Sequence, residues 1–340
     1  MRSKFIAVAV TSMMLFSVST VFASSPKSYL NDSSGAAATE QKMLNDGSAK
    51  EVANGFFKVN NFTYRILREN IISLYDCTET TKGIVNIPAY VDLNGQRYKV
   101  ICVDDDAFKD CTEITEVKIP EGVERIGVNA FYGCTKLFKV EIPETVTSIG
   151  NESFGHCSEL TDIKLPESIQ TIGAWAFNGC ENLREVTVPS NVTTIGNGTF
   201  NNCSNLASVR LPDGLMSIGL NAFNGCEKLT SVKLSGEIIS IGYYAFMDCV
   251  QLKDIYIPDK VKFIGYYAFA GCDQLENIYL PEDVDINGTE IPTTTTKVMY
   301  RINDGKVYIT EIVPGTGKEY VEIPIEISGM YVVNESGYND

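Results

Sequence analysis

The sequence predicts an α/β repeat fold: a solenoid of stacked coils with a parallel sheet, mostly strands and short helical turns, and β-hairpin-like caps at both ends. Three observations lead to this prediction. A phenylalanine recurs every 23 residues without a slip, and a cysteine follows each one three residues later. Between successive phenylalanines the chain carries the alternating apolar pattern of a strand, which usually ends at proline. Because one coil cannot bury its own apolar edge, such a short period indicates stacked coils.

The first 23 residues have the features of a secretory signal peptide. Arg2 and Lys4 form a basic start, an apolar stretch runs from Phe5 to Phe22, and small residues at its end offer a cleavage site. The alternative is an uncleaved membrane anchor, which the interspersed Ser and Thr and the cleavage pattern disfavour. We therefore expect a secreted or cell-surface protein with no membrane span after signal removal.

The mature chain is strongly acidic. The whole chain has a net charge of −15; the signal carries two of the 28 basic residues, so its removal leaves 26 basic against 43 acidic residues, or −17. This balance keeps a protein soluble and repels nucleic acid and anionic membranes, so we expect no nucleic-acid partner. Residues 24–54 are rich in Ala, Ser, Asn, Gly and charge, which predicts a flexible linker.

Residues 55–103 and 289–340 are predicted to be capping β segments, because the exposed core at each end of a solenoid must be shielded. The two segments echo one another, since Tyr64-Arg65-Ile66 in the first matches Tyr300-Arg301-Ile302 in the second. Two dipeptides within them favour hairpin turns: Asn94-Gly95 and Asp304-Gly305.

Residues 104–288 hold eight repeats. In one copy, Val140 and Ile142 alternate as inward residues of a strand that Pro143 ends. A second apolar pair, Val146 and Ile149, fills the return path, and the glycine after it allows a sharp turn. The segment around each phenylalanine is too short for more than a helical turn. Eight stacked strands predict a parallel sheet of about 38 Å, from about 4.8 Å per strand. The eight phenylalanines are Phe108, Phe131, Phe154, Phe177, Phe200, Phe223, Phe246 and Phe269.

This repeat resembles the BspA-like subclass of the leucine-rich repeat superfamily, whose 23-residue unit carries Ile-Gly-x-x-Ala-Phe-x-x-Cys-x-x-Leu-x-x-Val-x-Ile-Pro. The resemblance covers about Asp104 to Gly288 and is specific, because these positions recur together. Ser153 and Thr199 replace the alanine, and the last coil has an irregular end that we expect to be distorted. The resemblance implies a leucine-rich repeat solenoid in a bacterial protein associated with adhesion to host matrix proteins or other cells.

The cysteines favour a structural role. Equivalent cysteines on stacked coils run parallel and do not face each other, so we expect eight buried free thiols and no disulfides among them. A spacing of 23 residues does not suit a metal site. Cys77 and Cys102 lie outside this ladder, and we expect a disulfide between them that ties the first cap to the first coil. The ladder consists of Cys111, Cys134, Cys157, Cys180, Cys203, Cys226, Cys249 and Cys272.

No motif in the chain predicts catalysis. His156 is the only histidine, and the other coils hold Gly, Asn or Asp at its position, which is the set that a left-handed backbone selects. We therefore predict a turn residue there and not a catalytic base. Phosphate loops and dinucleotide motifs are missing, and carboxylates are scattered. We expect no enzyme, no cofactor and no bound metal.

The outward residues of the strands form a column that is mostly basic or aromatic. In the superfamily that the repeat resembles, this strand face usually binds partners. The alternative is that these are solvated charges paired with the neighbouring column of mixed charge, each contributing little. The candidate binding residues in the column are Lys118, Glu141, Lys164, Arg210, Lys233, Tyr256 and Tyr279, with Thr187 between them. The neighbouring column is Glu116, Lys139, Asp162, Glu185, Ser208, Ser231, Asp254 and Asn277.

A second candidate surface is aromatic: Tyr243, Tyr244, Tyr266 and Tyr267 follow the turn glycines of two late coils. Exposed tyrosines favour protein interfaces and sugar stacking, although these rings could instead cover the seams between coils. We expect a recognition protein that binds an extracellular protein, either of the host matrix or of a cell surface. The alternative is a glycan-binding module that uses the tyrosine-rich coils.

Overall fold

The computed structural model describes residues 49–53, 55–78, 81–286, 289–303, 306–316, 326–327 and 330–333. All of the described residues belong to one compact unit, Leu44–Asp340. The expected signal peptide and nearly all of the expected linker lie outside the described residues. None of the described segments forms a helix that is long and apolar enough to cross a membrane.

The described residues contain strands and turns but no helix, so the expected α/β class is corrected to a β-solenoid with a 23-residue repeat. The turn at each phenylalanine is too short to build an α-helical ladder, because its N–H groups alternate between two kinds of partner. Phe131 N donates to Ser153 O of the next coil at 2.7 Å, whereas Cys134 N donates back to Phe131 O at 3.2 Å. Bonding between coils therefore replaces the helical turn.

The N-terminal strands continue the stack of coils. Strands β2, β3 and β4 are antiparallel, β4 pairs in parallel with β7, and β7 pairs with the first return strand β9. The predicted hairpin turn joins β6 to β7, with Asn94 and Gly95 at φ 53° and 80°. The bounds are β1 Ala49–Ala53, β2 Phe56–Val59, β3 Phe62–Arg68, β4 Ile71–Cys77, β5 Gly83–Asn86, β6 Tyr90–Leu93 and β7 Gln96–Val103.

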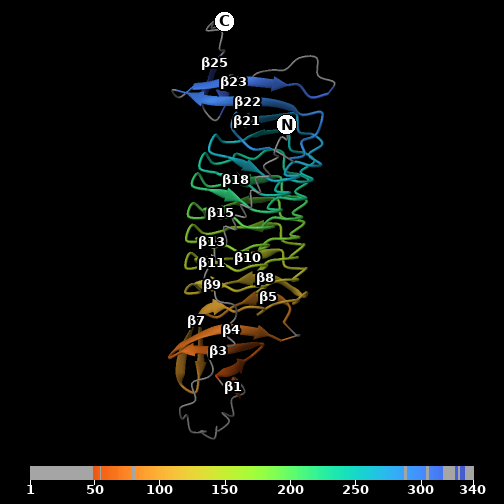
Figure 1. Ribbon diagram of the computed structural model, residues 1–340. Helices are drawn as coiled ribbons and strands as arrows, with labels where there is room; N and C mark the ends of the chain where they lie inside the picture. The colour runs from red at the N-terminus through yellow and green to blue at the C-terminus, as the bar shows by residue number, and fades with distance from the viewer. Residues whose placement is uncertain are drawn as a thin grey trace, which may run out of the picture. The chain divides into compact units, whose positions relative to one another are not determined.

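Parallel strands run along two sides of the coils (Figure 1). The predicted side, whose outer surface we call the strand face, has β5 followed by β8 Ile114–Lys118, β10 Lys139–Glu141, β12 Asp162–Ile163, β14 Glu185–Thr187, β16 Ser208–Arg210, β19 Asp254–Tyr256 and β21 Asn277–Pro281. The return path also forms strands, which the sequence did not predict. Its outer surface, the return face, has β9 Arg125–Ile126, β11 Ser148–Ile149, β13 Thr171–Ile172, β15 Thr194–Ile195, β17 Ser217–Ile218, β18 Ser240–Ile241 and β20 Phe263–Ile264.

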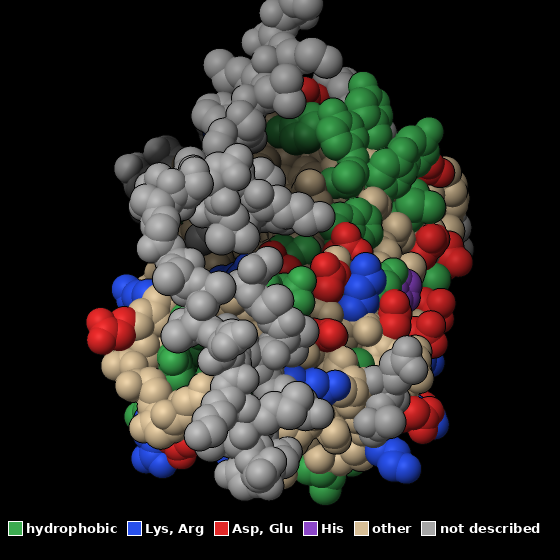
Figure 2. All heavy atoms as spheres, turned by 90° about the horizontal axis from the view of Figure 1, so that it is seen from below, with side chains coloured by type: hydrophobic (Ala, Val, Ile, Leu, Met, Phe, Trp, Pro, Cys, Tyr) green, Lys and Arg blue, Asp and Glu red, His purple; other side chains and the backbone are tan. Residues whose placement is uncertain are grey.

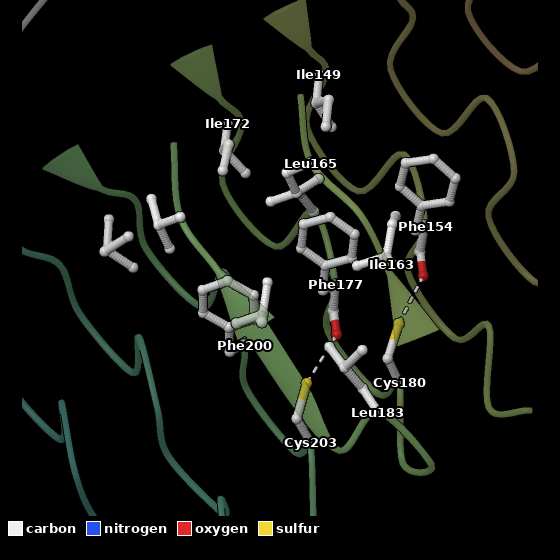
Figure 3. Close-up of a cluster of buried hydrophobic side chains, with 14 of the residues drawn as sticks. Ile149, Phe154, Ile163, Leu165, Ile172, Phe177, Cys180, Leu183, Phe200 and Cys203 are labelled. Atoms are coloured by element: carbon white, nitrogen blue, oxygen red, sulfur yellow. Dashed lines mark hydrogen bonds between the residues drawn. The ribbon is translucent and has the colours of Figure 1, made fainter. Parts of the chain in front are cut away.

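The core is a set of stacked ladders (Figure 3). All eight repeat phenylalanines are fully buried, and neighbouring rings such as Phe177 and Phe200 lie nearly parallel with centroids 5.5 Å apart. Each ladder thiol from Cys134 to Cys272 is buried and free and donates to the phenylalanine carbonyl of the preceding coil, as Cys203 does to Phe177 O at 3.2 Å. The predicted thiol ladder is therefore confirmed at these seven positions.

The first ladder cysteine differs. Cys111 is bonded to Cys77 in a disulfide, and Cys102 is a buried free thiol, so the expected Cys77–Cys102 pair is corrected. The register of the sheet explains the exchange. Ser73 of β4 lies opposite Cys102, so Cys77, four residues later in the strand, lies beyond Cys102. The Cys77 N–H donates to Ala107 O, which belongs to the turn that carries Cys111.

The glycine that follows each return strand allows close approach between coils. Gly150 has no left-handed φ, contrary to the expected sharp-turn role, but a Cβ built on it would lie 2.5 Å from Gly127 C. Real Cβ atoms do not approach backbone that closely, so the coils would have to separate. At Gly196 in the same column, the nearest atom to a Cβ is Thr199 Oγ1 at 3.3 Å.

Gly150→Ala is therefore expected to destabilise the fold by about 2–3 kcal/mol, and Gly196→Ala by less than about 1 kcal/mol. Urea unfolding of both variants, followed by circular dichroism, measures the difference. Equal losses at the two glycines would contradict the close-approach argument, because both substitutions change the unfolded chain in the same way.

The left-handed position predicted from the histidine column is confirmed. His156 has φ 58°, and all its equivalents in the other coils also lie in the left-handed region. Polar side chains alternate with glycine in this column, and a Cβ on Gly179 would lie 2.8 Å from His156 Nδ1. The imidazole thus occupies space above the next coil's glycine, which is a packing role.

The C-terminal strands β22 Thr296–Asn303, β23 Lys306–Val313, β24 Glu326–Ile327 and β25 Met330–Val333 follow the last coil. β22 adds to β21 in parallel and pairs with β23 antiparallel. The predicted turn Asp304-Gly305 between them lies outside the described residues. Tyr300 of β22 is almost fully buried and packs with Tyr279 and Val298 in a second apolar cluster.

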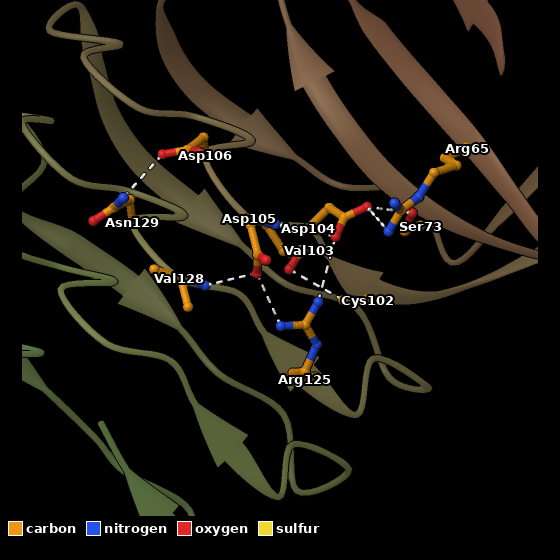
Figure 4. A network of polar contacts seen from close by, with 10 residues as sticks. All are labelled: Arg65, Ser73, Cys102, Val103, Asp104, Asp105, Asp106, Arg125, Val128 and Asn129. Carbon is orange, nitrogen blue, oxygen red and sulfur yellow. Dashed lines mark hydrogen bonds and ion pairs between the residues drawn. The ribbon is translucent and has the colours of Figure 1, made fainter. Parts of the chain in front are cut away.

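A buried carboxylate links the N-terminal strands to the first coil (Figure 4). Asp104 occupies the position that a glycine holds in the later coils. It belongs to the first coil, so no repeat coil precedes it in the stack. Its carboxylate is within 2.5 Å of Arg65 Nη2 and 3.3 Å of Arg125 Nη2, and Ser73 Oγ donates to it at 2.9 Å. The carboxylate thereby joins β3, β4 and β9.

Candidate partner-binding surfaces

The first part of the strand face neutralises its own charges. Glu141 accepts from Lys139 Nζ at 2.8 Å and lies 3.7 Å from Lys118 Nζ, while Lys139 lies 3.9 Å from Glu116. The hydrogen bond from Lys139 lowers the pKa of Glu141 below its ordinary value and raises the pKa of Lys139. All four side chains retain substantial exposure, so these pairs add little stability. Two of the predicted binding residues, Lys118 and Glu141, thus pair with protein groups.

The middle of the strand face carries basic side chains without such partners. Lys164, Arg210 and Lys233 are exposed, and none forms an ion pair or side-chain hydrogen bond with any residue that the structure describes. Arg184, just before β14, is exposed in the same way. The sequence did not point to Arg184, because it lies one residue before the neighbouring column of mixed charge, at a position where most coils have Thr or Ala. We call these four residues, Lys164, Arg184, Arg210 and Lys233, the strand-face basic patch.

The aromatic end of the column is covered. Tyr279 is only 4% exposed and stacks on Tyr256, with ring centroids 4.2 Å apart. Tyr300 of β22 donates its hydroxyl to Ile257 O at 2.5 Å beside them. Burial raises the pKa of both Tyr256 and Tyr279. The expectation that Tyr279 presents a binding surface is therefore corrected, because the C-terminal strands use this site for packing.

The four tyrosines of the late turns form two stacks. Tyr243 lies on Tyr266 with centroids 5.5 Å apart, and Tyr244 lies on Tyr267 at 5.4 Å, both pairs nearly parallel. Each ring covers one face of its neighbour, so at most one face of each ring is open to a ligand. Tyr244 and Tyr267 also have φ near 57°, which is strained for bulky residues.

A similar left-handed position holds the single tryptophan. Trp175 has φ 60°, and its indole lies directly over Gly198 of the next coil, where a Cβ would be 2.1 Å from the ring. Trp175 is half-buried and covers a seam between coils. It therefore does not extend the tyrosine surface toward the N-terminus.

The end of the molecule near β1 to β4 has exposed apolar side chains among mixed charges (Figure 2). Those of β3 and β4 include Ile66, Leu67 and Tyr75. Tyr75 makes an edge contact with Phe56 and lies 5.8 Å from the Arg65 guanidinium carbon. These contacts are local to the N-terminal strands and bring no predicted site residue together.

Comparisons with known proteins agree with this architecture. Residues 97–207 and 193–297 match the family described as BspA type leucine rich repeat region, in six copies. A leucine-rich repeat protein from Bacteroides ovatus is 30% identical, with a TM-score of 0.58 over 69% of this chain and 70% of that one. The leucine-rich repeat protein of T. pallidum is 33% identical, with a TM-score of 0.51 over 60% of this chain and 91% of that one. No curated protein matches the chain.

Proposed function

The chain belongs to the BspA type leucine-rich repeat family, and from that premise we propose that it is an exported recognition protein that binds a partner protein through the strand-face basic patch. Proteins built from these repeats are generally non-catalytic, so binding is the proposed activity and catalysis is not. Residues 1–23 would direct export, and the protein would act at the cell surface or outside the cell in adhesion to matrix proteins or other cells.

The observation that supports this proposal is the uneven neutralisation of the strand face. Its first coils carry an internal ion-pair network, and its last coils are covered by the cluster around Tyr300. Between them, Lys164, Arg210 and Lys233 are exposed without ionic partners among the described side chains. In a chain of net charge −15, such a patch favours a partner with acidic groups and orients its approach.

The decisive change is Lys164→Ala, Arg210→Ala and Lys233→Ala together. We expect binding of residues 24–340 to immobilised extracellular matrix proteins to weaken by about tenfold or more, and its salt dependence to become shallower. Surface plasmon resonance at two ionic strengths measures both effects. Residues 24–340 include the whole compact unit Leu44–Asp340 and omit the expected signal peptide.

A matched control removes the same charge elsewhere. Lys118, Lys136 and Lys139 are all ion-paired, and their joint change to Ala lowers the net charge equally. Binding should then stay within about threefold of the parent. The proposal fails if both triple variants lose binding equally, since net charge would then be the cause, or if the patch variant binds like the parent.

The glycan alternative receives less support. A sugar stacks on an open aromatic face, but each of the four tyrosines shares one face with its neighbour. The same immobilised panel can include glycans. Glycan binding that the patch variant leaves intact would favour the alternative over the proposed protein partner.

A further inference from the structure

The return face changes character along the stack. Three outward positions recur on it: the residue before each return strand, the strand's first residue, and the second residue after the strand. Beside β9, β11, β13 and β15 these positions are mostly polar. They hold Glu124, Arg125, Val128, Thr147, Ser148, Asn151, Gln170, Thr171, Ala174, Thr193, Thr194 and Asn197.

Beside the next three strands, six of the nine equivalent positions are apolar, and the other three are Ser217, Ser240 and Lys262. Met216 is 49% exposed, Ile239 51%, and Tyr266 49%, so these side chains are not part of the core. The repeat provides its own control, because the backbone is equivalent and only the side chains differ. We call these residues the return-face apolar patch: Met216 and Leu220 at β17, Ile239 and Tyr243 at β18, and Phe263 and Tyr266 at β20.

The patch is contiguous. Tyr243 stacks on Tyr266 and makes an edge contact with Phe263 at 5.7 Å between centroids. Ile239 lies directly over Met216, since Ile239 N donates to Met216 O at 2.9 Å. Adjacent coils therefore place aliphatic side chains at one end of the patch and aromatic rings at the other.

Two lysines at the patch are ion-paired, and Asp285 borders Phe263 in the next coil. Lys260 pairs with Glu237 at 2.7 Å, and Lys262 pairs with Asp283 at 2.5 Å. The patch is therefore a largely apolar area that contains one ion-paired lysine, Lys262, on a chain of net charge −15. Two copies of so acidic a protein repel each other where their acidic surfaces meet, and contact through a largely apolar area avoids part of this repulsion.

We propose that the return-face apolar patch binds a second copy of this chain, with the two solenoids antiparallel about a two-fold axis. A two-fold axis through β18 places the aliphatic end, Met216 and Leu220, against the aromatic end, Phe263 and Tyr266, of the other copy. The aliphatic end of each copy then contacts the aromatic end of the other, so the same contact forms twice, as an isologous interface requires. In each contact the methionine sulfur lies against aromatic edges.

The size of the patch sets the strength of the association. It spans three coils, or about 10 Å between the outer strands at about 4.8 Å per coil. This is the core of an interface smaller than the standard size, so the dimer should form in the micromolar range or weaker. Because like charges oppose it, added salt should strengthen it, whereas salt should weaken binding at the strand-face basic patch.

Sedimentation velocity of residues 24–340 at about 5 to about 200 µM, in about 20 and about 500 mM NaCl, tests the dimer. The weight-average mass should rise toward twice that of one chain, and more so in high salt. Ile239→Lys should abolish the rise, whereas Thr193→Lys, at the equivalent polar position beside β15, should not. A monomer at every concentration, or equal dimerisation of both variants, overturns the proposal.

Cross-linking gives a second measurement that does not depend on weakening the interface. Ser240 begins β18, near the proposed axis, so Ser240→Cys should cross-link to itself under mild oxidation. Thr171→Cys, at the equivalent position in β13, should stay monomeric, and the eight native free thiols are buried and should not contribute. Cross-linking of both variants, or of neither, contradicts the antiparallel arrangement. A dimer that persists when the strand-face basic patch is mutated would show that the two surfaces act independently.

Discussion

Raising the pH from 8 to 10 is expected to remove about 10 kcal/mol of folding stability, enough to unfold a typical domain. Burial raises the pKa of all eight free thiols above the ordinary 9.0, to about 12 at Cys134 and Cys272. A group with a raised folded pKa stabilises the fold fully below its unfolded pKa, and this contribution is lost as the pH rises toward the folded value. Near pH 10 the unfolded chain has released up to eight more protons, each worth about 1.4 kcal/mol per pH unit.

Urea unfolding at several pH values between 8 and 10, followed by circular dichroism, measures this loss. The midpoint should fall moderately between pH 8 and pH 9 and more steeply between pH 9 and pH 10. Cys203→Ala removes one of the eight thiols, so it should make the fall shallower by about one eighth, apart from a small loss from the cavity. A midpoint that is constant from pH 8 to pH 10 would show that the thiols do not titrate on unfolding.

Asp104→Ala is expected to destabilise the protein by about 3 kcal/mol, because it leaves two arginines of the N-terminal junction without their shared carboxylate. The Asp104 side chain is 5% exposed, whereas those of Arg65 and Arg125 are 27% and 38% exposed, which limits the loss. Thermal or urea unfolding of the purified variant measures the change in the free energy of unfolding.

The control for Asp104 is Asp92→Ala, which removes a carboxylate from an exposed ion pair with Arg97 at 3.0 Å. Solvent screens this pair, so the loss should be much smaller than that of the Asp104 variant. If the two variants lose the same stability, the Asp104 network has no special role at the junction.

The repeat made most of the fold predictable from the sequence. All eight Phe positions and seven of the eight Cys positions are buried where their period placed them, and the left-handed φ of His156 follows from its column of Gly, Asn and Asp. The return strands were missed because each has only two residues, too few for an alternating pattern, and pairing between coils is what defines them.

The candidate site was less predictable. The sequence predicted that most of this column points outward, but it could not show that Lys118 and Glu141 pair or that Tyr279 lies under the C-terminal strands. Those outcomes depend on side-chain distances and on segments that come from outside the repeat. Likewise, Cys77 bonds to Cys111 because of the register of β4 on β7, which no spacing in the sequence specifies.

By itself, the sequence determined the stacked coils and their core, because a fixed period of apolar residues has one economical way to be buried. Only the tertiary structure decided which glycines separate neighbouring backbones, which cysteine pairs with Cys77, and which charges stay unpaired. These features arise between coils, or between a coil and a cap, where the relevant atoms are far apart in the chain and are brought together by packing.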